Sequence, residues 1–155
     1  MLHDPRITTL YAPWQRAELQ STYDNVTSTD QSVTRRSLRQ EERVLHRILK
    51  AGGHIWAGTD EPLTHVAESL HETLRAEVRY GGFTPYQALR TAMVIPAHDI
   101  GVGDDLGTVQ AGKVADLMFV EGNPLAHITD TERVQMVMRG GHLYTIDQLL
   151  APFRH

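Results

Sequence analysis

The chain has 155 residues, of which 41% are hydrophobic and 22% charged, and it contains no cysteine. This composition excludes collagen-like, coiled-coil and disulfide-stapled chains, and the lack of cysteine excludes thiolate chemistry and cysteine zinc sites. The net charge of −4 offers no basic footprint for nucleic acid or an anionic membrane. No apolar stretch is long enough to cross a bilayer, and Met1–Pro5 does not begin a signal peptide, so we expect a soluble, cytoplasmic domain.

Residues 1–38 predict a loop, lid or linker segment. From Gln20 to Ser37 the sequence is dense in Ser, Thr, Asp, Asn and Arg and has few large apolar side chains. Such a composition buries little surface. Before it, the pattern is compatible with a short helix over Pro13–Leu19.

Residues 39–100 show the alternation of helices and a strand that is typical of α/β proteins. Apolar residues at helical spacing predict a helix that begins near Arg39 and ends at Gly52-Gly53. The apolar run His54–Gly58 then predicts a buried strand. A long amphipathic helix from Leu63 should follow and stop at Gly81-Gly82.

The next helix start is predicted by side chains that can close its first turn. Thr84 suits the N-cap, Pro85 the first helical position, and Gln87 the capping-box position. After Gly101 the pattern changes to short strands separated by turns, with a hairpin at Gly140-Gly141 and a closing helix capped by Thr145. These strands are predicted at 106–109, 116–120, 134–139 and 142–144.

Asp60 is the strongest single candidate for chemistry, because it directly follows the predicted strand at its carboxyl end. In parallel α/β proteins catalytic groups lie at that edge, where a carboxylate can bind metal or act as a general base. The alternative is that Asp60 only caps the following helix. On that helix, His65, Glu68 and Glu72 share a polar face that suits either a metal site or plain solvation, and His71 lies at the margin of the apolar stripe.

Two stretches of sequence carry a specific resemblance. The first is AGTD at 57–60, with SLHE at 69–72 and GFTPYQALRTA at 82–92; the second is LGTVQAGKVADL at 106–117, with GNPL at 122–125 and VMRGG at 137–141. In this order they resemble the carboxyl-terminal portion of metal-dependent amidohydrolases, in the imidazolonepropionase-like and prolidase-like branch. The resemblance extends over residues 39–150.

The resemblance implies an α/β protein built from the last units of a (β/α)8 metallo-hydrolase barrel and part of a small β-sandwich. The barrel part would span 39–100, and the sandwich half with its closing helix 101–155. Family enzymes bind one or two divalent metals, often zinc, and activate water for attack on amide or related C–N bonds. Asp60 matches the aspartate after the eighth strand, which would bind metal and take a proton from the water. Glu61, His65 and His71 would lie near a small amide-type substrate.

The family's other metal ligands have no match here. The chain contains no H-x-H pair, and its nine histidines show no ligand spacing. A complete barrel needs about 250 residues, and catalytic zinc sites use about three protein ligands. We therefore expect the isolated chain to be inactive and to bind no catalytic metal.

Three readings remain open at this point. The chain can be one part of a split enzyme that a complementary chain completes, or a non-enzymatic fragment that self-associates through open strand edges and uncovered apolar surface. In the third reading it is an unrelated α/β binding module in which Asp60 is a helix cap.

Overall fold

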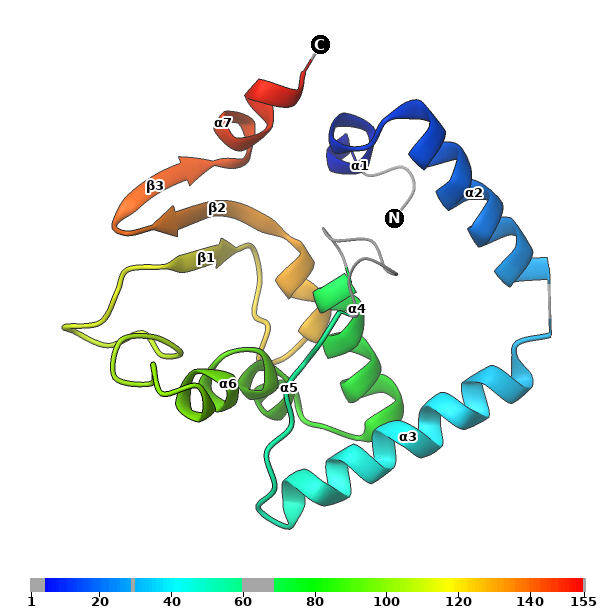
Figure 1. The fold of residues 1–155 in the computed structure, drawn as a ribbon, viewed down its shortest axis with the longest axis horizontal. Helices are drawn as coiled ribbons and strands as arrows, with labels where there is room; N and C mark the ends of the chain where they lie inside the picture. Colours follow the sequence, from blue (N-terminus) through cyan, green and yellow to red (C-terminus); the bar gives the residue numbers. More distant parts are fainter. Residues whose placement is uncertain (1–4, 29, 60–68, 155) are drawn as a thin grey trace.

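A computed structural model describes residues 5–28, 30–59 and 69–154 as a mixed α/β arrangement with a small antiparallel sheet (Figure 1). The helices and strands are α1 (Pro5–Leu10), α2 (Pro13–Ser28), α3 (Ser32–Lys50), α4 (Ser69–Ala76), the π-helical turn η1 (Glu77–Gly81), α5 (Pro85–Ala92), α6 (Val94–Asp99), β1 (Leu117–Val120), the 3-10 turn η2 (Ile128–Glu132), β2 (Val134–Arg139), β3 (His142–Thr145), α7 (Ile146–Leu150) and the 3-10 turn η3 (Ala151–Phe153). None of the helices within these ranges is long and apolar enough to span a membrane.

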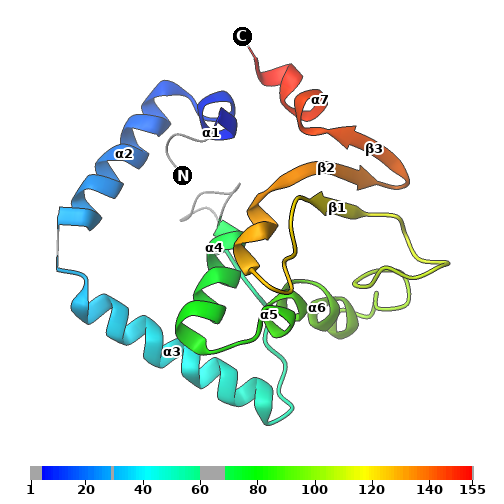
Figure 2. The same ribbon diagram turned by 180° about the vertical axis from the view of Figure 1, so that it is seen from behind.

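The first three helices follow the rim of the molecule as an open arc that starts at α1, near α7, and ends at α3, on the side away from the sheet (Figures 1 and 2). The prediction of a loop over 20–37 is therefore wrong, because α2 and α3 cover most of it. Polar residues here bond along the helix: Gln20 Nε2 donates to Asp24 Oδ1 over 2.8 Å, and the Thr27 hydroxyl donates to the Tyr23 carbonyl. Polar composition indicated solvent exposure and did not preclude a helix.

The core lies where α4, η1, α5 and η2 meet. Leu74, Phe83, Ala88 and Ile128 are its buried members, and Leu45, Leu49, Ala57, Val78, Leu89 and Ala92 pack around them. The chain turns back into this core at Gly82, whose φ of 78° is accessible to glycine without strain. This turn places Phe83, 3% exposed, directly inside.

Two predicted strands are not formed in the described part of the chain. Residues 54–58 are extended but pair with no strand there; the Ala57 amide instead donates to the Thr91 carbonyl on α5 over 3.0 Å. Residues 106–109 form an irregular turn, because Gly107 has a φ of 87° and Lys113 Nζ donates to the Leu106 carbonyl. A strand needs a neighbour for its backbone groups, and local sequence does not reveal whether one is present.

The helix predicted from near Arg39 begins earlier, at Ser32, and ends before Gly52-Gly53 as predicted. The start of the helix predicted from Leu63 lies outside the described residues, which show its last part as α4 and η1 up to Gly81.

The predictions of strands near 116–120, 134–139 and 142–144, of the hairpin and of both helix caps are confirmed. β1, β2 and β3 form one antiparallel sheet in that order, with Met118 opposite Val137 and Val137 opposite Tyr144. The hairpin turn has positive φ at Gly140 and Gly141, as a two-residue turn of this twist requires. Capping boxes begin both α5 and α7.

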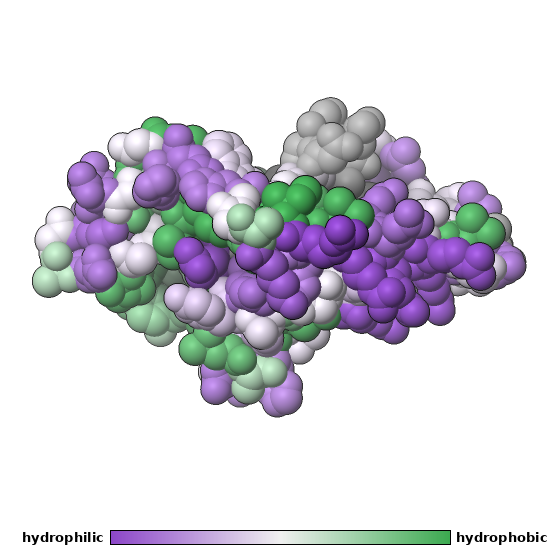
Figure 3. All heavy atoms as spheres, turned by 90° about the horizontal axis from the view of Figure 1, so that it is seen from below, coloured by the Kyte–Doolittle hydropathy of each residue, from purple (hydrophilic) through white to green (hydrophobic). Residues whose placement is uncertain are grey.

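The view from below shows hydrophilic residues gathered on the side where α3 lies, with apolar residues interspersed toward the sheet (Figure 3). Large apolar side chains are exposed at several places, among them Trp14 at 67% and Trp56 at 51%. Trp56 belongs to the segment 54–58, so the chain presents apolar surface beside backbone that has no strand partner among the described residues.

Candidate functional site

Of the four site residues predicted from the sequence, Asp60, Glu61 and His65 lie outside the described residues. His71 is described and lies on α4, half-buried. Next to the predicted site, the structure therefore describes two parts of the chain: the carboxyl end of the segment 54–58, and α4.

His71 contacts η2 across the α4–η2 interface. Its Nδ1 lies 3.1 Å from the Thr131 hydroxyl, which itself donates to the Ile128 carbonyl over 2.8 Å. Because that hydroxyl has one proton, His71 Nδ1 is the donor in this pair. His71 thus joins two elements, and its role near a substrate remains a prediction.

Of the predicted polar face, His65 and Glu68 lie outside the described residues, and Glu72 is described on α4, next to Thr73. Glu72 forms an ion pair with Arg75, whose guanidinium also reaches Glu132 over 3.3 Å. The Thr73 hydroxyl donates to the Gly58 carbonyl over 2.8 Å. This bond ties the carboxyl end of the extended segment to α4, so the backbone just before Asp60 is held on the helix.

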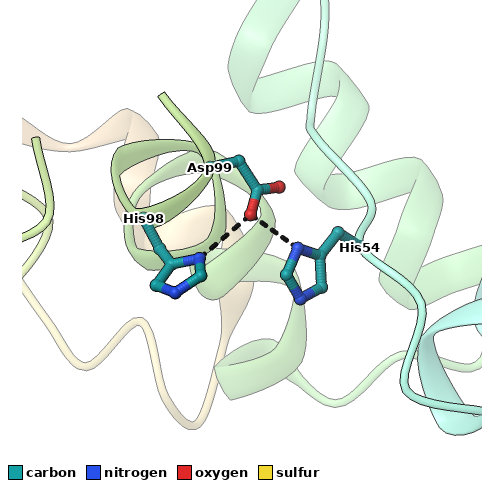
Figure 4. Close-up of side chains that lie close together, drawn as sticks. All are labelled: His54, His98 and Asp99. Carbon is teal, nitrogen blue, oxygen red and sulfur yellow. Dashed lines mark hydrogen bonds and ion pairs between the residues drawn. The ribbon is translucent and has the colours of Figure 1, made fainter. Parts of the chain in front are cut away.

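A second constellation, which the sequence reasoning missed, brings His54, His98 and Asp99 together (Figure 4). Asp99 Oδ1 lies 2.6 Å from His54 Nδ1 and 3.1 Å from His98 Nδ1. Trp56 Nε1 donates to the other oxygen, Oδ2, over 2.7 Å. Bonds from Trp56 and His98, followed by that from His54, lower the pKa of Asp99, so this carboxylate is charged at neutral pH.

The sequence offered little signal for this cluster. His54 opens the extended segment and His98 and Asp99 end α6, more than forty residues later. No ligand spacing links them, and only the adjacent His-Asp pair could have drawn attention.

A buried carboxylate lies between η1 and α5. Glu77 is 2% exposed, and both of its carboxylate oxygens are 3.0 Å from the Thr91 hydroxyl, which is itself fully buried. Burial raises the pKa of Glu77 to about 7, against the lowering effect of Thr91, and the nearby charge of Glu42 raises it further. This group titrates near neutral pH inside the fold.

The residues described here do not make up the metal centre that the resemblance implies. Their one cluster of three donors, His54, His98 and Asp99, lies at the start of the extended segment and the end of α6. The family's centre would instead use residues after the carboxyl ends of barrel strands.

Comparison with solved structures finds prolidase-like enzymes. A Xaa-Pro dipeptidase with bound methionine in its active site has a TM-score of 0.61 and 28% identity, over 67% of this chain and 25% of that one. A prolidase candidate from Bifidobacterium longum has a TM-score of 0.58 and 33% identity, over 64% and 25%. A molinate hydrolase has a TM-score of 0.57 and 25% identity, over 64% and 25%.

The chain therefore spans about a quarter of the length of these solved structures. Comparison with curated protein sequences finds no match. The model of the amidohydrolase family, by contrast, matches residues 7–144, which is most of the chain. On this match, and with prolidase-like structures as its neighbours, the chain belongs to the amidohydrolase family.

Proposed function

We propose that this chain forms the carboxyl-terminal segment of a metal-dependent amidohydrolase, with the last units of a (β/α)8 barrel over 39–100 and part of a small β-sandwich over 101–155. The observation that carries the proposal is the segment 54–58. It is extended, lies between α3 and α4 along the chain, and has no strand partner among the described residues. A barrel strand whose neighbours are supplied by other parts of the enzyme would have these features.

The reaction proposed is hydrolysis of a C–N bond, in an amide or cyclic amide of small size. Support comes from the family match and from neighbours whose names describe dipeptidase, prolidase and molinate hydrolase activity. In the complete enzyme a divalent metal, zinc in our proposal, would supply an activated water. The contribution of this chain is Asp60, as a ligand and as the base that accepts a proton, with Glu61, His65 and His71 near the substrate.

The chain alone should not hydrolyse amides, because Asp60 is the only family ligand matched in its sequence. A second candidate function is a partner-binding or self-associating subunit of a split enzyme. The exposed Trp56 on the unpaired segment favours it, since an open backbone edge beside apolar surface is a docking surface for another strand.

A chimaera tests the first proposal. Residues 39–150 would replace the equivalent carboxyl-terminal quarter of the Xaa-Pro dipeptidase, and zinc content and dipeptide hydrolysis would be measured. We expect a folded, active chimaera that loses activity at least a hundredfold on Asp60→Asn and keeps it on Asp104→Asn, a matched exposed aspartate. A folded, active chimaera that is insensitive to Asp60→Asn contradicts the proposal.

Light scattering during size-exclusion chromatography tests the second candidate on the 155-residue chain. Self-association should appear as a mass that rises with concentration and falls on Trp56→Ser. A stable monomer across the micromolar range would argue against it.

A further inference from the structure

We propose that His54, His98 and Asp99 form a binding site for a divalent transition-metal ion such as Zn²⁺, at the start of the extended segment 54–58. The site does not depend on the proposed hydrolase function. His54 is at the amino end of that segment, whereas Asp60 follows its carboxyl end in sequence. Gly58 is four residues after His54, and in extended chain this spacing spans about 13 Å.

The donor atoms of the three residues converge. One ligand atom from each of the three residues lies within 4.8 Å of the other two. The distances from Asp99 Oδ1 to the two Nδ1 atoms are 2.6 Å and 3.1 Å. Ligands of a tetrahedral zinc at 2.0–2.1 Å are about 3.3 Å apart, so small side-chain rotations would accommodate an ion among them.

The two imidazole rings are also oriented toward one point. Figure 4 shows both imidazoles with Nδ1 turned toward the same carboxylate oxygen. The two rings are nearly perpendicular, at 84°, with centroids 5.8 Å apart. They approach Asp99 from different directions, as two corners of one coordination sphere must.

The Asp99 carboxylate is held in place by neighbouring groups. Trp56 Nε1 holds Oδ2 over 2.7 Å, which leaves Oδ1 facing the histidines. Metal sites commonly use such an outer hydrogen bond to orient a ligand. The Ala57 amide bond to the Thr91 carbonyl holds the segment on α5, so the two parts of the site keep their separation.

The cluster is accessible from solvent. His54 and His98 side chains are 53% and 75% exposed, whereas the Asp99 side chain is 18% exposed. An ion can therefore enter from solvent, and water can complete its coordination. Two imidazoles and one carboxylate suit first-row divalent metals better than Ca²⁺ or Mg²⁺, which prefer oxygen.

The test is zinc binding by the tag-free 155-residue chain, measured by competition with a chromophoric chelator. We expect one Zn²⁺ per chain, with affinity reduced at least tenfold by each of His54→Ala, His98→Ala and Asp99→Asn. Trp56→Phe should weaken binding severalfold without changing the stoichiometry. Co²⁺ in place of Zn²⁺ should give visible absorption of a low-coordinate site that these same variants lose.

Two controls separate this site from others. His142→Ala, an exposed histidine on β3, should leave the affinity unchanged. Asp60→Asn should also leave it unchanged, which separates the result from the proposed hydrolase function. His98 is the most exposed of the three, so His98→Ala should keep the fold, which circular dichroism would check.

Three outcomes would overturn the proposal. The first is the absence of stoichiometric zinc binding. The second is zinc binding that survives in a double variant with both His54→Ala and His98→Ala. The third is zinc binding that is lost on Asp60→Asn but kept in the His54→Ala and His98→Ala variants. In the first outcome the cluster is a hydrogen-bonded His–Asp group only.

Discussion

The Glu77 carboxylate shows how burial sets the properties of a single residue. It is 2% exposed, and its hydrogen-bond donor, the Thr91 hydroxyl, lies 3.0 Å from both oxygens and shares its one proton with the Ala88 carbonyl at 2.6 Å. One neutral donor does not replace the water that a charged carboxylate loses. The pKa of Glu77 is therefore raised from 4.5 to about 7.

This shift makes stability depend on pH. The unfolded chain releases the Glu77 proton near pH 4.5 and the folded chain near pH 7, so in that window the folded state binds more protons. The stability that the protonated Glu77 carboxyl contributes below pH 4.5 is consequently lost as pH rises through 7. The difference between the folded and unfolded pKa values corresponds to at most about 3 kcal/mol of unfolding free energy.

Glu77→Gln should remove this dependence, because the amide is neutral and still accepts from Thr91. We expect equal unfolding free energies for both proteins at pH 4.5, and a variant more stable by up to about 3 kcal/mol at pH 8. Urea denaturation at the two pH values measures it. The matched control is Glu121→Gln at an exposed ion pair with Arg133, which should shift stability by less than about 1 kcal/mol. A Glu77→Gln variant that is destabilised equally at both pH values would contradict the account.

At the scale of elements, α5 is defined by its first turn. The Thr84 hydroxyl accepts from the Gln87 amide over 3.2 Å, and Gln87 Oε1 accepts from the Thr84 amide over 2.9 Å. The cap fixes where the helix begins, and this sets the positions of Ala88, fully buried, and Thr91. A local motif thus aligns the residues that face the core and Glu77.

Thr84→Ala should lower the unfolding free energy by about 1 kcal/mol, because the Gln87 amide at the helix start loses the hydroxyl that accepts its hydrogen bond. Thr84→Ser restores the hydroxyl and should recover most of it. Chemical denaturation of the three proteins measures the difference. Equal stability of the alanine and serine variants would show that the cap contributes nothing.

The distance along the sequence between interacting residues explains which elements were predicted correctly. Caps and the Gly140-Gly141 hairpin depend on residues within a few positions of one another, so their chemistry is readable directly. The segment 54–58 failed as a strand because pairing depends on neighbours that no local pattern reports. The helical arc at the amino end was missed because its polar residues suit an exposed helix as well as a loop.

The whole molecule depends on a small core. Phe83 is central to it: its ring stacks on His46 at 4.6 Å, and His46 Nδ1 lies 3.1 Å from the Gly81 carbonyl. Phe83 therefore connects the core to α3. Domains of this size have only about 5–15 kcal/mol of net stability.

Phe83→Ala should cost about 3–5 kcal/mol, through lost transfer energy and the cavity left behind. That is a large share of the total, so we expect a broadened or low-temperature unfolding transition and release of α3. Thermal unfolding by circular dichroism measures it. Phe153→Ala, at a side chain that is 51% exposed, should change stability by less than about 1 kcal/mol. Equal effects of the two substitutions would contradict this description of the core.

The sequence by itself determined the family resemblance, the capping boxes, the hairpin and the candidate Asp60, because each depends on residue types at short and fixed spacing. Only the tertiary structure decided that residues 54–58 lack a strand partner in the described chain, that Glu77 is buried, and that His54 meets His98 and Asp99. These features arise from contacts between segments far apart along the chain. Their free energies depend on burial and distance, which no local pattern of residues specifies.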